Sequence, residues 1–230
     1  MRNVRFQVAR NDTGNFIVQE YCLPYQPQKT IVWWLTRIQE ELDPSLAFPI
    51  ACRAGLCGGC GLMINNRSVL ACETMLDTFL TEGNDMVSLM PLRGFPVIKD
   101  LLVDWIPAKE RMQQLAPWDH SGRVIDIRTD LALKPDACNS LMKLGSCITC
   151  GLCVSECPVR ENGAFIEPYL FVKCHKILVD PRVDEVNKQA VISSLEPYLN
   201  WCIGCGKCTE VCPKGLSPKA TIHCIRQLHH

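Results

Sequence analysis

The amino-acid sequence predicts an α+β protein with two domains, at residues 1–104 and 105–230. Two stretches near the start alternate apolar and polar residues, which is typical of half-buried strands. The second half instead spaces its apolar residues as amphipathic helices do. The third observation is that twelve of the sixteen cysteines fall into three spaced groups, within 52–72, 147–157 and 202–212.

Composition and charge exclude several classes of protein. A chain of 230 residues with 47% apolar residues is ordinary for one or two globular domains. The formal net charge is zero and no long basic run occurs, so we expect no nucleic-acid partner. The chain runs from Met1 directly into an alternating stretch, which indicates no signal peptide. No apolar run reaches the roughly 18 residues of a membrane span. We expect a soluble protein of a reducing compartment.

The first elements predict a small sheet. Residues 4–8 and 16–18 alternate apolar and polar side chains on either side of Asn-Asp-Thr-Gly at 11–14, so they form a β-hairpin. Thr30 is then an N-cap for a helix over residues 31–42, whose apolar residues follow helical spacing. The order strand, strand, helix and cysteine loop is that of a β-grasp domain.

The cysteine loop has the spacing C-x4-C-x2-C with a distant fourth cysteine, which is the plant-type pattern for a [2Fe–2S] cluster. The predicted ligands are Cys52, Cys57, Cys60 and Cys72. Glycines at 55, 58, 59 and 61 would supply unusual backbone angles round a cluster, and backbone N–H groups brought close could bond the sulfurs. The alternative is a glycine-rich turn with incidental cysteines.

The second and third groups both read C-x2-C-x2-C-x3-C-P, the bacterial ferredoxin run, in which the fourth cysteine ligates the other run's cluster. A first [4Fe–4S] cluster would therefore take Cys147, Cys150, Cys153 and Cys212. A second would take Cys157, Cys202, Cys205 and Cys208. A single CxxC could hold zinc or act as a redox dithiol, but two complete runs favour iron–sulfur clusters over zinc.

Helices are expected to surround these runs as an α-helical ferredoxin domain. The predicted helices span 109–115, 137–144, 167–178 and 188–195, with a loop at Ser121-Gly122 and a polar turn at 181–187. The cysteines outside the motifs are Cys22, Cys138, Cys174 and Cys224. We expect these four to be buried like small apolar residues rather than to bind a metal.

The combined pattern resembles the iron–sulfur subunit of succinate dehydrogenase and fumarate reductase over residues 4–222. Residues 96–104 look like that family's bridge between its domains, and residues 212–218 look like its closing motif. The resemblance implies an FAD-containing flavoprotein partner that interconverts succinate and fumarate, and a chain that relays electrons between that flavin and an acceptor. It also implies a cytoplasmic protein held at the inner face of the membrane by a partner, with no catalytic residue of its own.

Two departures from the family concern the acceptor. Most members lack the second cysteine of the last run and hold a three-iron cluster there. Because Cys205 fills that position, we expect [4Fe–4S], or [3Fe–4S] if Cys205 is not a ligand. Ubiquinone-reducing members have Ser and Trp where this chain has residues 159–162, and His where it has Ile203. We therefore assign no quinone site to these residues. The partner on the acceptor side is expected to be a membrane-anchor subunit or a cysteine-rich subunit that resembles heterodisulfide reductase, and a low-potential cubane would suit a different terminal partner, or menaquinone rather than ubiquinone.

Other functions remain open at this stage. The sequence shows no flavin fingerprint, no nicotinamide loop and no plausible constellation of acid–base residues, so the organic chemistry belongs to a partner. The chain could instead serve another flavin-dependent organic-acid or acyl dehydrogenase. A free-standing ferredoxin usually has a strongly charged face, which zero net charge disfavours. In hydrogenase and complex I subunits, the first two [2Fe–2S] ligands are further apart in the sequence than Cys52 and Cys57 are here. This spacing disfavours both classes.

Overall fold

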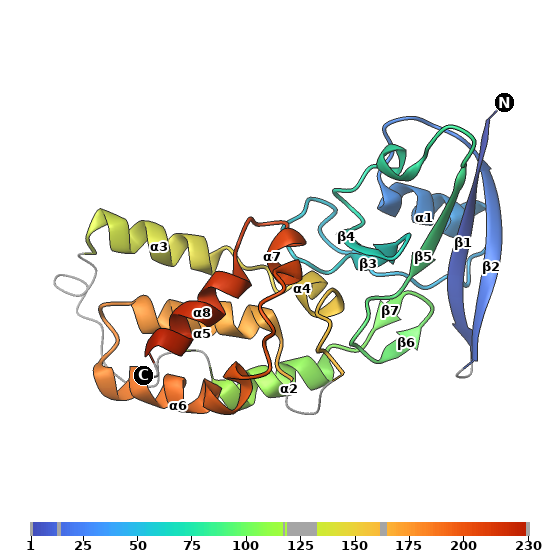
Figure 1. The fold of residues 1–230 in the computed structure, drawn as a ribbon. Coiled ribbons are helices and arrows are strands. Elements are labelled where there is room, and N and C mark those ends of the chain that lie inside the picture. The colour runs from blue at the N-terminus through green and yellow to red at the C-terminus, as the bar shows by residue number, and fades with distance from the viewer. Residues whose placement is uncertain (1, 13–14, 117, 119–132, 162–164, 229–230) are drawn as a thin grey trace. The chain divides into compact units, whose positions relative to one another are not determined.

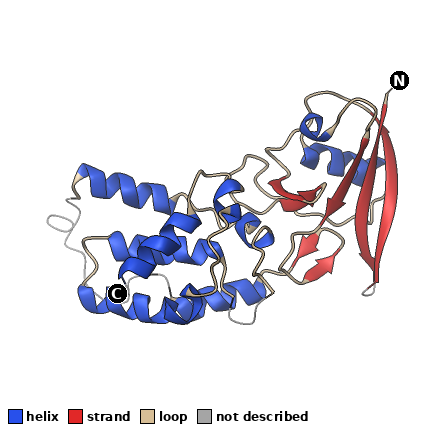
Figure 2. Cartoon of the chain, viewed as in Figure 1, coloured by secondary structure: helices blue, strands red, loops and turns tan. Residues whose placement is uncertain are grey.

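The computed structural model describes residues 2–12, 15–116, 118, 133–161 and 165–228. It forms two compact units, one of Met1–Trp105 with Ile148–Glu156 and one of Ile106–Cys147 with Cys157–His230. Strands occur in the first unit, whereas the described part of the second unit has helices only, so the α+β class is confirmed (Figure 2). The expected loop at Ser121-Gly122 and the tip of the hairpin at Thr13-Gly14 lie outside the described residues.

The first unit is built on a mixed five-stranded sheet with the order β2-β1-β5-β3-β4 (Figure 1). Its strands are β1 (Asn3–Asp12), β2 (Asn15–Pro24), β3 (Gly61–Ile64), β4 (Arg67–Leu70) and β5 (Met86–Met90). β1 and β5 are parallel, and the other neighbouring pairs are antiparallel. A two-stranded ribbon of β6 (Val97–Lys99) and β7 (Leu102–Val103) occupies the segment that resembles the family's bridge, and it belongs to this unit.

The expected hairpin is present, but only part of it is half-buried. β1 pairs with β2 along the whole length of both strands, and Val4, Phe6 and Val8 are fully buried. Phe16 and Val18 are instead 55% and 64% exposed. Phe16 and Val18 share a face of edge strand β2 with the exposed Glu20 and Cys22, whereas Tyr21 and Leu23 on the other face are buried.

Helix α1 (Ile31–Glu41) packs against this sheet, as the sequence predicts. The Thr30 side chain accepts a hydrogen bond from the backbone N–H of Trp33 at 3.4 Å, which confirms the N-cap. Ile38 is fully buried, and the Trp34 ring lies 5.4 Å from that of Phe6 in the core. A short 3-10 helix, η1 (Leu76–Phe79), and the four-residue helix α4 (Leu152–Ser155) complete the unit.

The second unit is a group of helices around α5. Its helices are α2 (Ile106–Leu115), α3 (Pro135–Gly145), α5 (Pro168–Val179), α6 (Glu185–Leu199), α7 (Lys207–Glu210) and α8 (Pro218–Leu228). α5 contacts α3, α6 and α8. The four predicted helices are confirmed with shifted ends. The predicted turn at 181–187 is wrong in its last residues, because Asp184 caps α6 through a 2.9 Å bond from the N–H of Asn187. Within the described residues, no helix is long and apolar enough to cross a membrane.

Candidate iron–sulfur sites

The hairpin of β3 and β4 positions two of the four cysteines in the first group. Cys60 precedes β3 and Cys72 follows β4, and both are buried. Their Sγ atoms lie 3.2 Å apart, too far for a disulfide bond of about 2.0 Å but close enough for both to bind one tetrahedral iron. Cys52 and Cys57 belong to the exposed part of the loop. The donor set therefore has a buried pair and an exposed pair.

Backbone N–H groups of the loop point at cysteine sulfurs. Gly55 donates to Cys72 Sγ at 3.2 Å, and Gly59 donates to Cys57 Sγ at 3.4 Å. Such bonds stabilise negative charge on sulfur and raise the potential of a cluster. They are the interactions that the glycine-rich sequence leads us to expect.

Two of the four loop glycines have the backbone angles that the sequence predicts. Gly55 and Gly58 have φ of +64° and +72°, which residues with a Cβ rarely adopt. Gly59 and Gly61 are not among the residues with positive φ, so the prediction is wrong for them. At Gly61 the reason is packing, because a Cβ there would lie 2.8 Å from Leu92 Cδ1.

The two sides of this site differ in electrostatics. The backbone N–H of Ala54, with further hydrogen bonds from Cys57 and Leu56, lowers the pKa of Cys52 to about 6. Burial raises the pKa of Cys60 to about 12. Iron would bind these thiols as thiolates, so Cys52 is better prepared for ligation than Cys60.

The two ferredoxin runs have the same local backbone. Left-handed residues occur at Thr149 and Gly151 in the first run and at the matching Gly204 and Gly206 in the second. A four-residue helix begins one residue later in each, α4 in the first run and α7 in the second. The second run, which contains Cys205, therefore has the same local conformation as the first.

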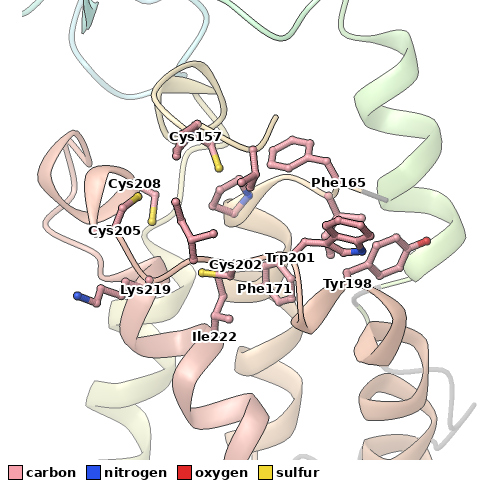
Figure 3. Close-up of a pocket in the computed structure, with 17 residues that line it drawn as sticks. Cys157, Phe165, Phe171, Tyr198, Trp201, Cys202, Cys205, Cys208, Lys219 and Ile222 are labelled. Atoms are coloured by element: carbon pink, nitrogen blue, oxygen red, sulfur yellow. The ribbon is translucent and has the colours of Figure 1, made fainter. Parts of the chain in front are cut away.

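Four cysteines of the second unit surround one pocket, shown in Figure 3. They are Cys157, Cys202, Cys205 and Cys208. Burial is the main reason that the pKa of Cys208 is raised to about 11, and the other three cysteines add to this. The rest of the pocket wall is largely apolar. Its aromatic residues are Phe165, Phe171, Tyr198 and Trp201. The predicted ligands of the second cubane thus line one largely apolar pocket, and Cys205 is among them.

The predicted ligands of the first cubane are divided between the two units. Cys150 and Cys153 belong to the first unit, and both are buried. Cys147 and Cys212 belong to the second unit, and both are partly exposed. Their assignment to one cluster stays a prediction from the sequence.

The donor chemistry fits clusters better than single metal ions. All sixteen cysteines lie in the described part of the chain and are free thiols. Among the described residues, no three His, Cys, Asp or Glu side chains are grouped closely enough to hold one metal ion, as zinc would require. Thiolates spread round a larger space suit an iron–sulfur cluster.

Of the four cysteines outside the motifs, Cys174 is fully buried as expected, but Cys22 is exposed on edge strand β2, so the burial prediction is wrong there.

Sequence reasoning missed a residue that supports the second cubane site. Arg226 on α8 donates to the backbone oxygens of Leu199 at 3.1 Å and Cys202 at 2.8 Å, and so fixes the chain entering the last run. It lies 24 residues from Cys202, so spacing gives no signal.

Val159 and Ile203, which stand where quinone-binding residues occur in ubiquinone-reducing relatives, line the pocket. Asn162 lies outside the described residues.

Comparison with known proteins agrees with both cluster types. Residues 2–110 match the family described as a 2Fe-2S iron-sulfur cluster binding domain, and residues 143–216 match the 4Fe-4S dicluster domain. The chain is 32% identical to the fumarate reductase iron-sulfur subunit of Wolinella succinogenes, over 91% of this chain and 88% of that protein. It is 30% identical to the 8-methylmenaquinol:fumarate reductase iron-sulfur subunit of the same organism, over 97% and 72%.

A solved structure gives the same result. A chain of the Mycobacterium smegmatis Sdh1 complex in the apo form superposes with a TM-score of 0.89 and 25% identity, covering 99% of this chain and 95% of that one. Sequence and fold thus agree over nearly the whole chain. The protein belongs to the family of iron–sulfur subunits of fumarate reductase and succinate dehydrogenase.

Proposed function

We propose that this chain is the electron-transfer subunit of a complex that interconverts succinate and fumarate. Its membership of the iron–sulfur subunit family and its two cluster-binding regions support this role. When bound, the clusters would supply one-electron chemistry between an FAD-containing flavoprotein and the acceptor. The chain itself would hold the clusters, hydrogen-bond their sulfurs and exclude water.

The proposed ligands follow the three cysteine groups. The [2Fe–2S] cluster would be held by Cys52, Cys57, Cys60 and Cys72. The first [4Fe–4S] cluster would be held by Cys147, Cys150, Cys153 and Cys212, and the second by Cys157, Cys202, Cys205 and Cys208. The observation that carries the last assignment is the single pocket to which Cys205 contributes with the other three cysteines.

The acceptor we propose is menaquinone, reached through a membrane-anchor subunit at the inner face of the cell membrane. A complete four-cysteine site favours a cubane of lower potential than a three-iron cluster. One relative in the family is named for 8-methylmenaquinol. The alternative acceptor is a cysteine-rich, heterodisulfide-reductase-like subunit, which a cubane at this position would also suit.

Low-temperature EPR with an iron count tests the cluster assignment. The anaerobic wild-type protein should be silent when oxidised and should show a [2Fe–2S] signal and two coupled cubanes after reduction by dithionite. Cys205→Ala should lose about one iron and gain a three-iron signal in the oxidised state, because three thiolates remain at that site. Cys22→Ala, at an exposed cysteine outside the motifs, is the matched control and should change nothing. A strong three-iron signal in the wild-type protein would contradict ligation by Cys205.

Co-purification separates the proposed function from its alternatives. An FAD subunit that reduces fumarate or oxidises succinate should purify with this chain in stoichiometric amount. A partner that is active on another organic acid or an acyl compound would show that the chain serves a different flavin dehydrogenase. Isolation of the chain with all its clusters but no flavoprotein would favour a free-standing carrier.

A further inference from the structure

Part of the first ferredoxin run belongs to the [2Fe–2S] unit. Residues 148–156, which the sequence assigns to the second domain, form one compact unit with residues 1–105. We call residues 148–156 the anchored segment. It contains Cys150 and Cys153, two proposed ligands of the first cubane, and its helix α4 contacts β4 (Figure 1).

Two side chains attach the anchored segment to backbone N–H groups of the first unit. Glu156 Oε1 accepts a 2.7 Å bond from Ser68 N on β4. Ser155 Oγ, which is fully buried, accepts a 3.0 Å bond from Arg93 N beyond β5. Each bond gives a backbone N–H of the first unit a hydrogen-bond acceptor from the anchored segment. The bond to the Glu156 carboxylate is charge-assisted and so the stronger of the two.

Backbone contact with the [2Fe–2S] loop, residues 52–60, is direct. A Cβ on Gly58 would lie 2.6 Å from the Ile148 oxygen and 2.9 Å from Cys150 Cα, closer than real Cβ atoms approach. A Cβ on Gly61 would lie 3.1 Å from the Cys150 oxygen. The backbone next to Cys57 therefore touches the backbone of a proposed cubane ligand.

The second run provides an internal comparison. Both runs have the same cysteine spacing and the same pattern of left-handed residues. Where the first has Ser155-Glu156, the second has Glu210-Val211, and the side chain of Val211 cannot accept a hydrogen bond. Cluster binding alone therefore does not require Ser-Glu at these positions. Attachment to the first unit does explain the pair.

We propose that Ser155 and Glu156 are positioning residues that fix Cys150 and Cys153 against the [2Fe–2S] loop. This inference rests on the proposed function, because it concerns the step between the [2Fe–2S] centre and the first cubane. Electron tunnelling falls steeply with distance, so holding two of the cubane's four proposed ligands against the [2Fe–2S] loop would help to fix the separation of the two centres. A site of this kind needs supporting contacts that hold its ligands in place.

The test uses the full-length protein with its clusters and the variants Glu156→Ala and Glu156→Gln. The first readout is hydrogen exchange of the peptide that contains the Ser68 amide. The second is the relaxation rate of the reduced [2Fe–2S] EPR signal, which reports its magnetic interaction with the neighbouring cubane. Glu161→Ala is the matched control, because the Glu161 side chain is 85% exposed and forms an ion pair with the neighbouring Arg160.

Glu156→Ala should raise the exchange rate of the Ser68 amide about tenfold or more. It should also weaken the magnetic interaction between the two clusters or widen the distribution of its strength. Glu156→Gln should restore both, since its amide oxygen can accept the same bond. If Glu156→Ala does not accumulate as folded protein, Ser155→Ala removes the other attachment and should speed exchange at Arg93. Unchanged exchange and unchanged relaxation in these variants would overturn the inference.

Failure of the proposed function would look different. A wild-type protein without a [2Fe–2S] signal, or one that binds no flavoprotein, would be detected before any variant is compared. The first result would overturn the inference together with the function. The second would leave the exchange and relaxation comparisons to decide the positioning role alone.

Discussion

Arg10 organises a polar network inside the first unit. Its side chain is 10% exposed, and its Nε lies 3.0 Å from Asp100 Oδ1, a carboxylate with a side chain that is 1% exposed. Asp100 also accepts the backbone N–H of Ala47 at 2.9 Å. The guanidinium contacts Asp43 as well, and Tyr21 donates to Asp43 at 2.6 Å. The network thus joins β1, β2, the end of α1 and the turn before β7.

The charge on Asp43 should make this unit sensitive to acid. Hydrogen bonds from Ser45, Tyr21 and Arg10 lower the pKa of Asp43 below its usual value. A lowered folded-state pKa adds stability above the unfolded value of about 3.9, and this stability is lost as the pH falls below it. Asp43→Asn should therefore lower the free energy of unfolding by about 2 kcal/mol at pH 7, with the difference from wild type shrinking below about pH 4.

Urea unfolding between pH 2 and 7 measures this difference. Asp85→Asn is the control, because the Arg2–Asp85 pair is exposed and such pairs contribute about 0–1 kcal/mol. A constant gap between wild type and Asp43→Asn across this pH range would show that the ionised carboxylate is not what stabilises the network.

The three cysteine groups could be read from the sequence, whereas the residues that support them could not. Ligands within one run are three or four residues apart, so a local pattern reveals them. Arg226 and Glu156 act on backbone groups 24 and 88 residues away. Nothing in local spacing encodes such pairs, since only the tertiary fold brings them together.

Length decided which elements the sequence revealed. The hairpin and five helices of ten residues or more, α1, α2, α3, α5 and α6, were predicted. The four-residue helices α4 and α7 span about one turn each and carry no period to detect. Helix α8 was missed although a signal was present, because Pro218 opens it and Ile222 and Ile225 lie on its buried side.

The start of α6 offers a test at the scale of one element. The Asp184 side chain accepts from the N–H of Asn187 at 2.9 Å, which satisfies one of the free donors of the first turn. Asp184→Ala should remove this bond and lower the thermal stability of the protein. Asp184→Asn should keep most of it, because Asn caps helices about as well as Asp.

Thermal unfolding followed by circular dichroism compares these two variants with wild type. Equal loss in both would mean that the charge near the helix N-terminus, rather than the hydrogen bond, is what matters. No loss in either would show that α6 is held by the packing of Val191 and Leu195, which are buried, and that its cap contributes little.

At the scale of the whole molecule, the two units should depend on iron to different extents. The first unit has a five-stranded sheet and a helix that share a buried core, and two of its four proposed cluster ligands are in an exposed loop outside that sheet. In the second unit, the proposed ligands Cys157, Cys202, Cys205 and Cys208 line a pocket whose wall includes the buried Phe171 of α5 and Ile222 of α8. Metal binding contributes folding free energy wherever the unfolded chain has no preformed site, so the second unit should lose more stability without its clusters.

Hydrogen exchange of the full-length protein before and after anaerobic removal of iron tests this difference. Amides of β1 and β5 should keep nearly all their protection, and amides of the loop at residues 52–60 should lose theirs. Amides of α5, α6 and α8 should exchange far faster, because opening of the second unit no longer requires breaking iron–sulfur bonds. Equal loss of protection in β1 and α5 would show that the units unfold as one body. Retained protection in α5 would show that apolar packing alone folds the helical unit, and the clusters would then serve redox chemistry without a structural role.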